Sequence, residues 1–167
     1  MSIAVFHNAD NICLVDKKRL DELKSFALAA TMKRARLCLH KSDDDLLHEM
    51  LIVFHKDAII KPHRHSIKTE SYHVIYGELD VILFDDNGEP TNIIELGDLN
   101  SGKPFVYRIS CPTWHTVLIR TEFAAIHEVT NGPFKIEESE FAPWAPEDLY
   151  KLNLYINEKI IKFNKNE

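Results

Sequence analysis

Glycine is scarce in this sequence of 167 residues: there are only five, and none of them belongs to a glycine-rich loop. A phosphate-binding loop needs several glycines close together, because its backbone amides must approach the phosphate directly. The sequence therefore excludes a glycine-rich phosphate-binding loop. It also lacks a recognisable nucleophile elbow, the turn that presents the serine of a Ser-His-Asp triad.

Cysteine is almost as rare, and Cys13, Cys38 and Cys111 are widely spaced without a CxxC pair. This pattern argues against a disulfide framework and against a thiolate zinc site. We interpret all three as reduced, mostly buried thiols, since a free cysteine behaves as a small hydrophobic residue. Cys111 stands four residues before His115 and is the one closest to a candidate site.

Blocks of positive charge and long hydrophobic runs are also missing. The formal net charge is −6, and clustered Lys and Arg are what nucleic-acid binding requires, so we expect no nucleic-acid partner. No apolar run approaches the roughly 20 residues that span a bilayer, and the N-terminal region lacks a signal-peptide pattern. We expect a cytoplasmic protein without a membrane-inserted segment.

The pattern of apolar residues predicts a single domain over residues 1–167, mainly β, with a helix at each end. Three- and four-residue spacing predicts an N-terminal helix over 16–34, capped by Asp16, and a C-terminal helix over 146–164. Short alternating segments over 58–130 predict the core of an antiparallel sandwich or barrel.

Within this core, turn residues separate the expected strands. Asp86-Asn87-Gly88 predicts a hairpin, and Gly77 marks a turn that needs positive φ. Residues 46–56 fit either a short buried helix or a strand. The expected strands are 36–40, 58–61, 71–76, 79–84, 91–96, 105–110, 116–120 and 124–129.

Three potential metal ligands gather within eight residues: His63, His65 and Glu70. Side chains alternate along a strand, so both imidazoles point to the same face. His115 begins a later strand, and in an antiparallel barrel it can lie opposite the first pair. Together these residues predict a site with three histidines and one carboxylate. Strand parity places His73 on the opposite face from Glu70, which predicts a structural role for it.

The order His63, His65, Glu70 and Gly77, followed by Pro112 and His115, resembles the two motifs of the cupin family. Within that family the chain is most similar to the WbuC-type cupin fold metalloproteins. The phrases that carry this likeness are Pro62-His63-Arg64-His65, Lys68-Thr69-Glu70-Ser71, Phe84-Asp85-Asp86-Asn87-Gly88, Tyr107-Arg108-Ile109, Trp114-His115-Thr116, Glu128, Gly132-Pro133-Phe134 and Phe141-Ala142-Pro143-Trp144-Ala145-Pro146.

The resemblance implies a cupin-type antiparallel β-sandwich or barrel, also called a double-stranded β-helix, with flanking helices. It also implies one divalent metal ion, and this mixed ligand set suits Zn, Fe, Mn, Ni or Co. The WbuC-type proteins are associated with surface polysaccharide (O-antigen) synthesis, and the resemblance further implies a homodimer. We therefore expect a carbohydrate-type small molecule as ligand.

Several kinds of activity fit such a site. Metal-assisted isomerisation or epimerisation is one, iron-dependent dioxygenation is another, and a non-catalytic sugar-binding or sensing module is the third. Lys68, Tyr72 and Arg108 are the candidates for substrate binding: Tyr72 shares the parity of Glu70, and the two cations suit a phosphate or carboxylate.

Overall fold

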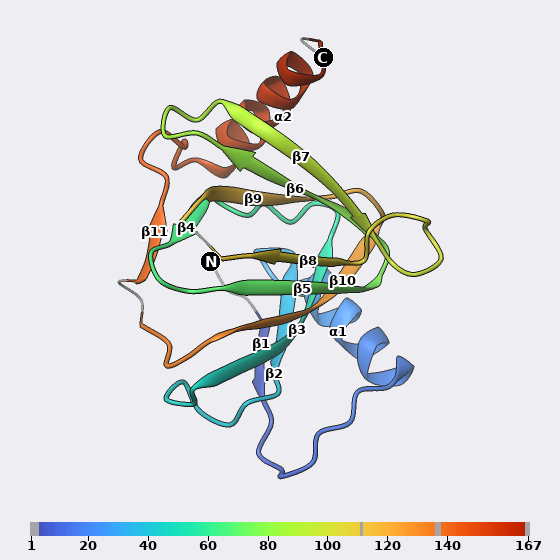
Figure 1. Ribbon diagram of the computed structural model, residues 1–167. Helices are drawn as coiled ribbons and strands as arrows, with labels where there is room; N and C mark the ends of the chain where they lie inside the picture. Colours follow the sequence, from blue (N-terminus) through green and yellow to red (C-terminus); the bar gives the residue numbers. More distant parts are fainter. Residues whose placement is uncertain (1–3, 111, 136–137, 166–167) are drawn as a thin grey trace.

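The computed structural model describes residues 4–110, 112–135 and 138–165, and its strands form two sheets that face each other (Figure 1). The first sheet has the order β1-β2-β3-β10-β5-β8, and the second has the order β11-β4-β9-β6-β7. The strands of the first sheet are β1 (Ala4–His7), β2 (Arg34–Cys38), β3 (Leu47–His55), β5 (Glu70–Tyr76), β8 (Val106–Ile109) and β10 (Phe123–Asn131). Those of the second are β4 (His63–His65), β6 (Glu78–Phe84), β7 (Pro90–Gly97), β9 (Trp114–Ile119) and β11 (Ser139–Phe141).

The strand pairs are antiparallel except for β1 and β2, which are parallel and joined by α1 (Lys17–Ala29). Asp16 caps α1 as the sequence predicts, because its side chain accepts a hydrogen bond from the backbone amide of Arg19. The helix ends at Ala29 rather than at residue 34. The chain then turns through Lys33, which has a φ of 54°, and enters β2.

Strand β3 resolves the ambiguity of residues 46–56, because both of its faces are covered. Leu51 and Val53 pack with α1 in one cluster, whereas Met50, Ile52 and Phe54 face the space between the sheets. A strand that is buried on both sides is apolar at nearly every position, and such a run shows neither the strand nor the helix period clearly. The β core therefore begins well before residue 58.

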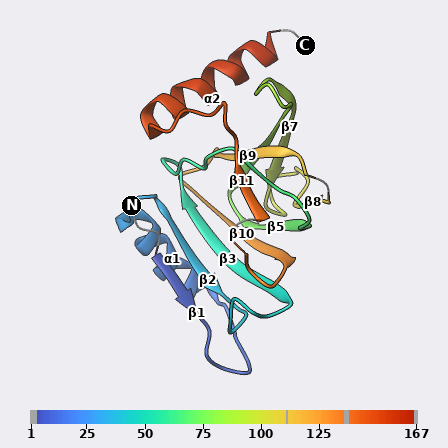
Figure 2. The same cartoon turned by 90° about the vertical axis from the view of Figure 1, so that its left-hand side faces the viewer.

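Helix α2 (Leu149–Asn164) covers the outer face of the second sheet (Figure 1). Leu152, Ile156 and Ile160 are buried there with Ile82 and Phe84 of β6. The helix begins at Leu149 rather than at residue 146, and Asp148 is its N-cap: the Asp148 side chain accepts a hydrogen bond from the backbone amide of Lys151. The two helices lie apart from each other, α1 against the first sheet and α2 against the second (Figure 2).

Two of the predicted turns are present. Gly77 has a φ of +74° and joins β5 to β6, while Gly88 has a φ of +80° in the hairpin between β6 and β7. The expected strand over 58–61 is wrong: this segment is an irregular connection, and the adjacent strand is the short β4. Strands β1 and β11 were not predicted from the sequence.

The two facing, mostly antiparallel sheets with a helix against each form a cupin-type β-sandwich, so the predicted fold class is confirmed. The arrangement matters for function because the interior of the sandwich is reached by side chains from both sheets. Neither helix in the described part of the chain is long and apolar enough to cross a membrane.

Candidate metal centre

Three histidines converge from the second sheet. His63 and His65 lie two residues apart on β4, so both side chains point into the sandwich. Strand β4 pairs with β9, and the register places His63 directly opposite His115. The ring centroids of His63 and His115 are 4.5 Å apart, and those of His63 and His65 are 5.2 Å apart.

Glu70 completes the cluster from the opposite sheet, where it is the first residue of β5. Its carboxylate oxygens lie 2.9 Å from Nε2 of His65 and 3.2 Å from Nε2 of His115. One potential ligand atom from each of His63, His65, Glu70 and His115 can be chosen so that all four lie within 4.8 Å of one another. The structure thus brings together all four residues that the sequence singles out, in a group that can hold a metal ion.

The other ring nitrogen of each histidine is already occupied. Nδ1 of His63 lies 2.9 Å from the carbonyl oxygen of Lys61, and Nδ1 of His115 lies 2.9 Å from that of Thr113. A carbonyl oxygen only accepts, so both Nδ1 atoms carry the proton, and in a neutral ring Nε2 keeps a lone pair. Nδ1 of His65 is within 3.1 Å of the hydroxyl of Ser139. Partners of this kind orient the histidines of metal sites.

These contacts show that the residues fit a cation. Nε2 of His115 is buried and has no hydrogen-bond partner among the described residues, although a carboxylate oxygen is only 3.2 Å away. Two acceptors at this distance repel each other unless a proton or a positive ion lies between them. Nitrogen and carboxylate ligands together suit a first-row transition metal.

The charges of the cluster are mutually dependent. Although burial alone would raise the pKa of Glu70, the adjacent imidazoles of His115 and His65 hold it well below its usual range. Burial acts against the charged form of His115, but Glu70 outweighs it, so the pKa of His115 is raised. Burial and the charge of His115 lower the pKa of His63 to about 4. One carboxylate and a neutral His63 are thus favoured near neutral pH.

A cavity of about 600 Å³ extends from this cluster between the sheets. This is within the roughly 300–1,000 Å³ of small-molecule sites. Its middle is lined by apolar side chains and by two polar groups, the carboxyl group of Glu128 and the phenol of Tyr72. These two residues are register partners on β10 and β5. The apolar side chains are Met50, Ile52, Phe54, Ile60, Val117 and Ile126.

Both polar groups in the middle of the cavity have shifted pKa values. Burial and the negative charge of Glu70 raise the pKa of Glu128 to about 7. Burial, followed by the charge of Glu70, raises the pKa of Tyr72 well above 10. The Tyr72 hydroxyl lies 3.4 Å from Oε2 of Glu70. Glu128 can therefore gain or lose a proton near neutral pH, whereas Tyr72 stays protonated.

The three predicted substrate residues occupy different positions. Tyr72 and Lys68 line the cavity, and Lys68 is buried and paired with Glu138 at 3.5 Å rather than solvated. Arg108 is exposed, because the register pairs it with Ser71 while the neighbouring pair of Tyr72 and Tyr107 faces inward. Strand parity thus places Arg108 on the outer face of the first sheet, away from the cavity lining.

Other polar residues of the cavity were missed from the sequence as site residues. Arg34 and Arg36 line it from β2, and Glu128 lines it from β10. Their alternation with buried Ala35 and Leu37 was a usable signal, because it shows that one face of β2 is apolar and the other charged. The pairing of β2 with β3, which turns that charged face inward, has no local signature.

Two expectations concern other residues. His73 is exposed and points away from Glu70, as parity predicts. Cys38 is a buried free thiol and Cys13 is half-buried, whereas Cys111 lies outside the described residues. Burial raises the pKa of the Cys38 thiol, so it is not an activated nucleophile.

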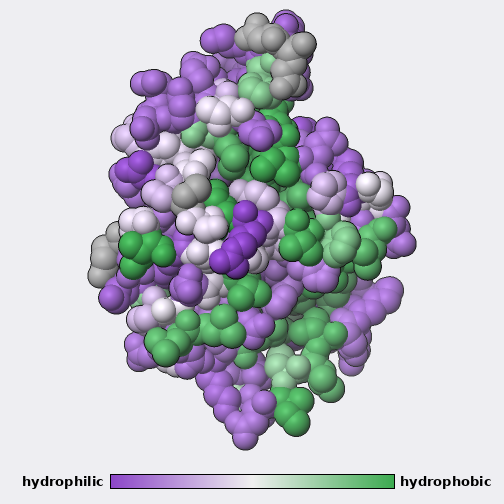
Figure 3. Space-filling view, viewed as in Figure 1, coloured by the Kyte–Doolittle hydropathy of each residue, from purple (hydrophilic) through white to green (hydrophobic). Residues whose placement is uncertain are grey.

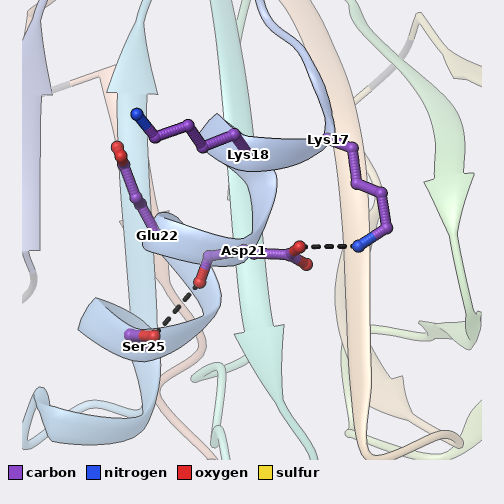
Figure 4. Close-up of a pocket in the computed structure, with 5 residues that line it drawn as sticks. All are labelled: Lys17, Lys18, Asp21, Glu22 and Ser25. Carbon is purple, nitrogen blue, oxygen red and sulfur yellow. Dashed lines mark hydrogen bonds and ion pairs between the residues drawn. The ribbon is translucent and has the colours of Figure 1, made fainter.

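A second hollow lies along α1, where charged side chains surround an open surface (Figure 4). Lys17 pairs with Asp21 at 2.7 Å, and Ser25 donates to the carbonyl oxygen of Asp21. Pairs of this spacing are typical of a solvated helix face. On the face shown in Figure 3, hydrophobic and hydrophilic residues are interspersed. The cavity between the sheets is therefore the candidate site.

Comparison with known proteins supports the fold and leaves the activity open. A family model described as a domain of unknown function (DUF6016) matches residues 15–96. No curated protein matches the sequence.

Among solved structures, the chain is similar to protein SO0799 from Shewanella oneidensis, with 15% identity and a TM-score of 0.56 over 75% of this chain and 82% of that one. It also matches oxalate decarboxylase from Bacillus subtilis, with 21% identity and a TM-score of 0.48 over 66% of this chain and 28% of that one. The cupin domain of Schizosaccharomyces pombe Cnp3 matches with 12% identity and a TM-score of 0.45, over 59% of this chain and 64% of that one.

At 15% identity, the similarity to SO0799 shows the fold alone. Together, the strand order and the internal cluster define a cupin-fold protein with a His–Glu site that can hold a metal ion.

Proposed function

We propose that this protein binds one divalent transition-metal ion through His63, His65, Glu70 and His115 and acts on a small molecule in the adjoining cavity. The observation that carries the proposal is the grouping of one ligand atom from each of the four residues within 4.8 Å of one another, while the Nδ1 atom of each histidine contacts another oxygen. Zn, Fe, Mn, Ni and Co all suit this ligand set. When bound, such an ion supplies Lewis acidity toward an oxygen of the ligand.

The groups beside the cluster favour proton-transfer chemistry, that is, an isomerase or epimerase. These reactions move a proton without net oxidation, so they need a group that accepts and returns it near neutral pH. Glu128, whose pKa is about 7, has that property, and it faces the same cavity as Tyr72. The Tyr72 hydroxyl donates its hydrogen bond toward Glu70.

The finer assignments rest on the resemblance to WbuC-type proteins. We propose a carbohydrate-type ligand, a place in surface polysaccharide synthesis, and a cytoplasmic homodimer made of single-domain subunits. The apolar middle of the cavity supports a sugar ring, because the ring's CH groups pack on such a surface while its hydroxyls reach the polar groups.

The metal is tested by elemental analysis of protein purified without added metal. The unmodified chain should contain close to one metal ion per subunit. His65→Ala combined with Glu70→Ala should reduce this content at least about tenfold, because two of four ligands are lost. The matched control is His73→Ala, since His73 lies on the same strand as Glu70 and faces outward. Full metal retention in the double variant, with a β-rich circular dichroism spectrum, would overturn the metal assignment.

The reaction class is tested separately. Unmodified protein is incubated in D2O with candidate sugars, and deuterium incorporation at carbon is followed by NMR. Incorporation should be lost in Glu128→Gln while the metal content stays unchanged. Incorporation at the unmodified rate in that variant would exclude Glu128 as the proton carrier, and metal-dependent binding of a sugar without incorporation would favour a binding or sensing role.

A further inference from the structure

Arg34 and Arg36 form a second polar region of the cavity, on the opposite side from Glu70. They occupy alternate positions of β2, so their side chains emerge on the same face, and both line the cavity. In the first sheet β2 is separated from β5 by β3 and β10, and the inner positions of these two strands carry the apolar middle of the cavity. The arginines and the metal cluster therefore bound one continuous space at different ends.

The guanidinium groups are incompletely satisfied by the chain itself. The Nε atoms of Arg34 and Arg36 are both buried and, over the described ranges, have no hydrogen-bond partner. Glu128, on the same sheet as the arginines, attracts both, but no ion pair joins its carboxylate to either arginine in the part of the chain that the structure describes. Two buried N–H donors, on two residues that line the cavity, are therefore left without an acceptor.

This arrangement is unfavourable without a ligand. A guanidinium group does not lose its proton in proteins, and a buried donor without an acceptor costs free energy. Burial and the adjacent positive charge of Arg36 lower the pKa of Arg34, which reflects the repulsion between the two side chains. An anion between the arginines relieves both the repulsion and the missing hydrogen bonds.

We propose that Arg34 and Arg36 bind the oxyanion group, a phosphate or a carboxylate, of a small molecule whose other end reaches the metal centre. The planar donor fork of arginine matches the two oxygens of such a group. For the metal end the inference rests on the proposed function, whereas the oxyanion end depends on the two arginines alone. The ligand is thus an anionic molecule with a polar, ring-sized middle, such as a sugar phosphate or a sugar acid.

The experiment measures binding of inorganic phosphate and of acetate to the full chain by isothermal titration calorimetry in a chloride buffer. The variants are Arg34→Gln, Arg36→Gln and Arg36→Lys, the last of which keeps the charge but loses the fork. The matched control is Arg108→Gln, which removes the same charge from the outer face of the same sheet. Circular dichroism confirms that each variant is folded, and metal content is measured on the same samples.

Each glutamine variant should weaken binding of the preferred anion at least about tenfold, Arg36→Lys should weaken it less, and Arg108→Gln should leave it unchanged. Tighter binding of phosphate than of acetate identifies a phosphate ligand, and the reverse order a carboxylate. Unchanged binding in Arg34→Gln and Arg36→Gln would overturn the inference, as would a dissociation constant weaker than about 10 mM for both anions in the unmodified protein.

This design tests the metal site and the anion site independently of each other. His65→Ala with Glu70→Ala should lose the metal and keep its affinity for the anion, since neither residue is in the arginine pair. Full metal retention in this double variant, together with arginine-dependent anion binding, contradicts only the proposed function. Metal loss in the double variant, together with anion binding that does not depend on Arg34 and Arg36, contradicts only the inference made here.

Discussion

His63 on β4 and His115 on β9 are register partners, so the first and the last ligand of the cluster lie side by side on neighbouring strands. Each uses Nδ1 to bind a carbonyl oxygen two residues before it in the chain, that of Lys61 or of Thr113. The backbone that precedes each histidine therefore fixes the orientation of its ring. His65 differs, because its Nδ1 partner is a side chain, Ser139 on β11.

Ser139→Ala tests this partner of His65. The substitution removes the hydroxyl that orients the imidazole and leaves all four ligands in place, so metal affinity should fall by roughly 10–100-fold. Competition with a chromophoric chelator measures the affinity. Ser25→Ala is the control, since Ser25 is exposed on α1 and bonds only the backbone of its own helix. Equal affinities in the two variants would show that Ser139 does not position His65.

Glu128→Gln should change how stability depends on pH. Burial and the charge of Glu70 raise the pKa of Glu128 from the usual 4.5 to about 7 in the folded protein. Because the folded value is the higher one, the protonated carboxyl contributes stability fully below about pH 4.5 and loses it as the pH rises through 7.

The variant keeps a neutral side chain at every pH. In metal-free protein it should therefore be more stable than the unmodified chain at pH 8, by on the order of 1–3 kcal/mol, and nearly equal to it at pH 4.5. Urea unfolding at the two pH values measures this difference. The stability gained by the substitution should be larger at pH 8 than at pH 4.5. A smaller gain at pH 8 would contradict the raised pKa of Glu128.

Gly77→Ala and Gly102→Ala separate backbone strain from steric overlap. Both glycines have positive φ, +74° and +76°, so alanine is strained at either position by roughly 1 kcal/mol. At Gly102 no atom lies within 4 Å of an added Cβ, whereas at Gly77 the Cβ would overlap the carbonyl oxygen of Phe123. Gly77→Ala should therefore be the more destabilising by at least about 2 kcal/mol in urea unfolding. Equal losses would mean that the turn at Gly77 relaxes freely.

Leu152→Ala and Leu154→Ala test the packing of α2. Leu152 is fully buried against the second sheet, and Leu154 is 46% exposed on the same helix. Truncating the first removes buried apolar contacts and should cost about 2–5 kcal/mol, while truncating the second should change stability by less than about 0.5 kcal/mol. Thermal unfolding compares them. A large effect of Leu154→Ala would instead reveal a partner on the outer face of α2.

The sequence predicts the metal cluster better than the cavity around it, for a physical reason. Alternation along one strand places His63 and His65 together, and this requires no knowledge of which strands pair. Arg34, Arg36 and Glu128 come from β2 and β10, and only the pairing of these strands with β3 brings them to one surface. Register between distant strands depends on side chains and turns throughout the sheet.

The same limit explains why one segment stayed open between helix and strand and why two strands were not predicted. Residues 46–56 are apolar on both faces because α1 covers one side and the sandwich interior covers the other, so neither period dominates. The short strands β1 and β11 form because they pair with a neighbouring strand, not because their own residues alternate clearly. β1 pairs with the parallel β2, and β11 pairs with β4. Arg108 was expected in the site from its charge alone, which says nothing about the face on which it lies.

Glu70 stands on one sheet and the three histidines stand on the other, so the complete ligand set exists only after the sheets have packed together. With the second sheet alone, the chain would offer an ion at most the three histidines. Binding through all four ligands would thus be a late step of folding, and a bound ion would join the two sheets. Under the proposed function, chelation should lower the stability of the whole sandwich.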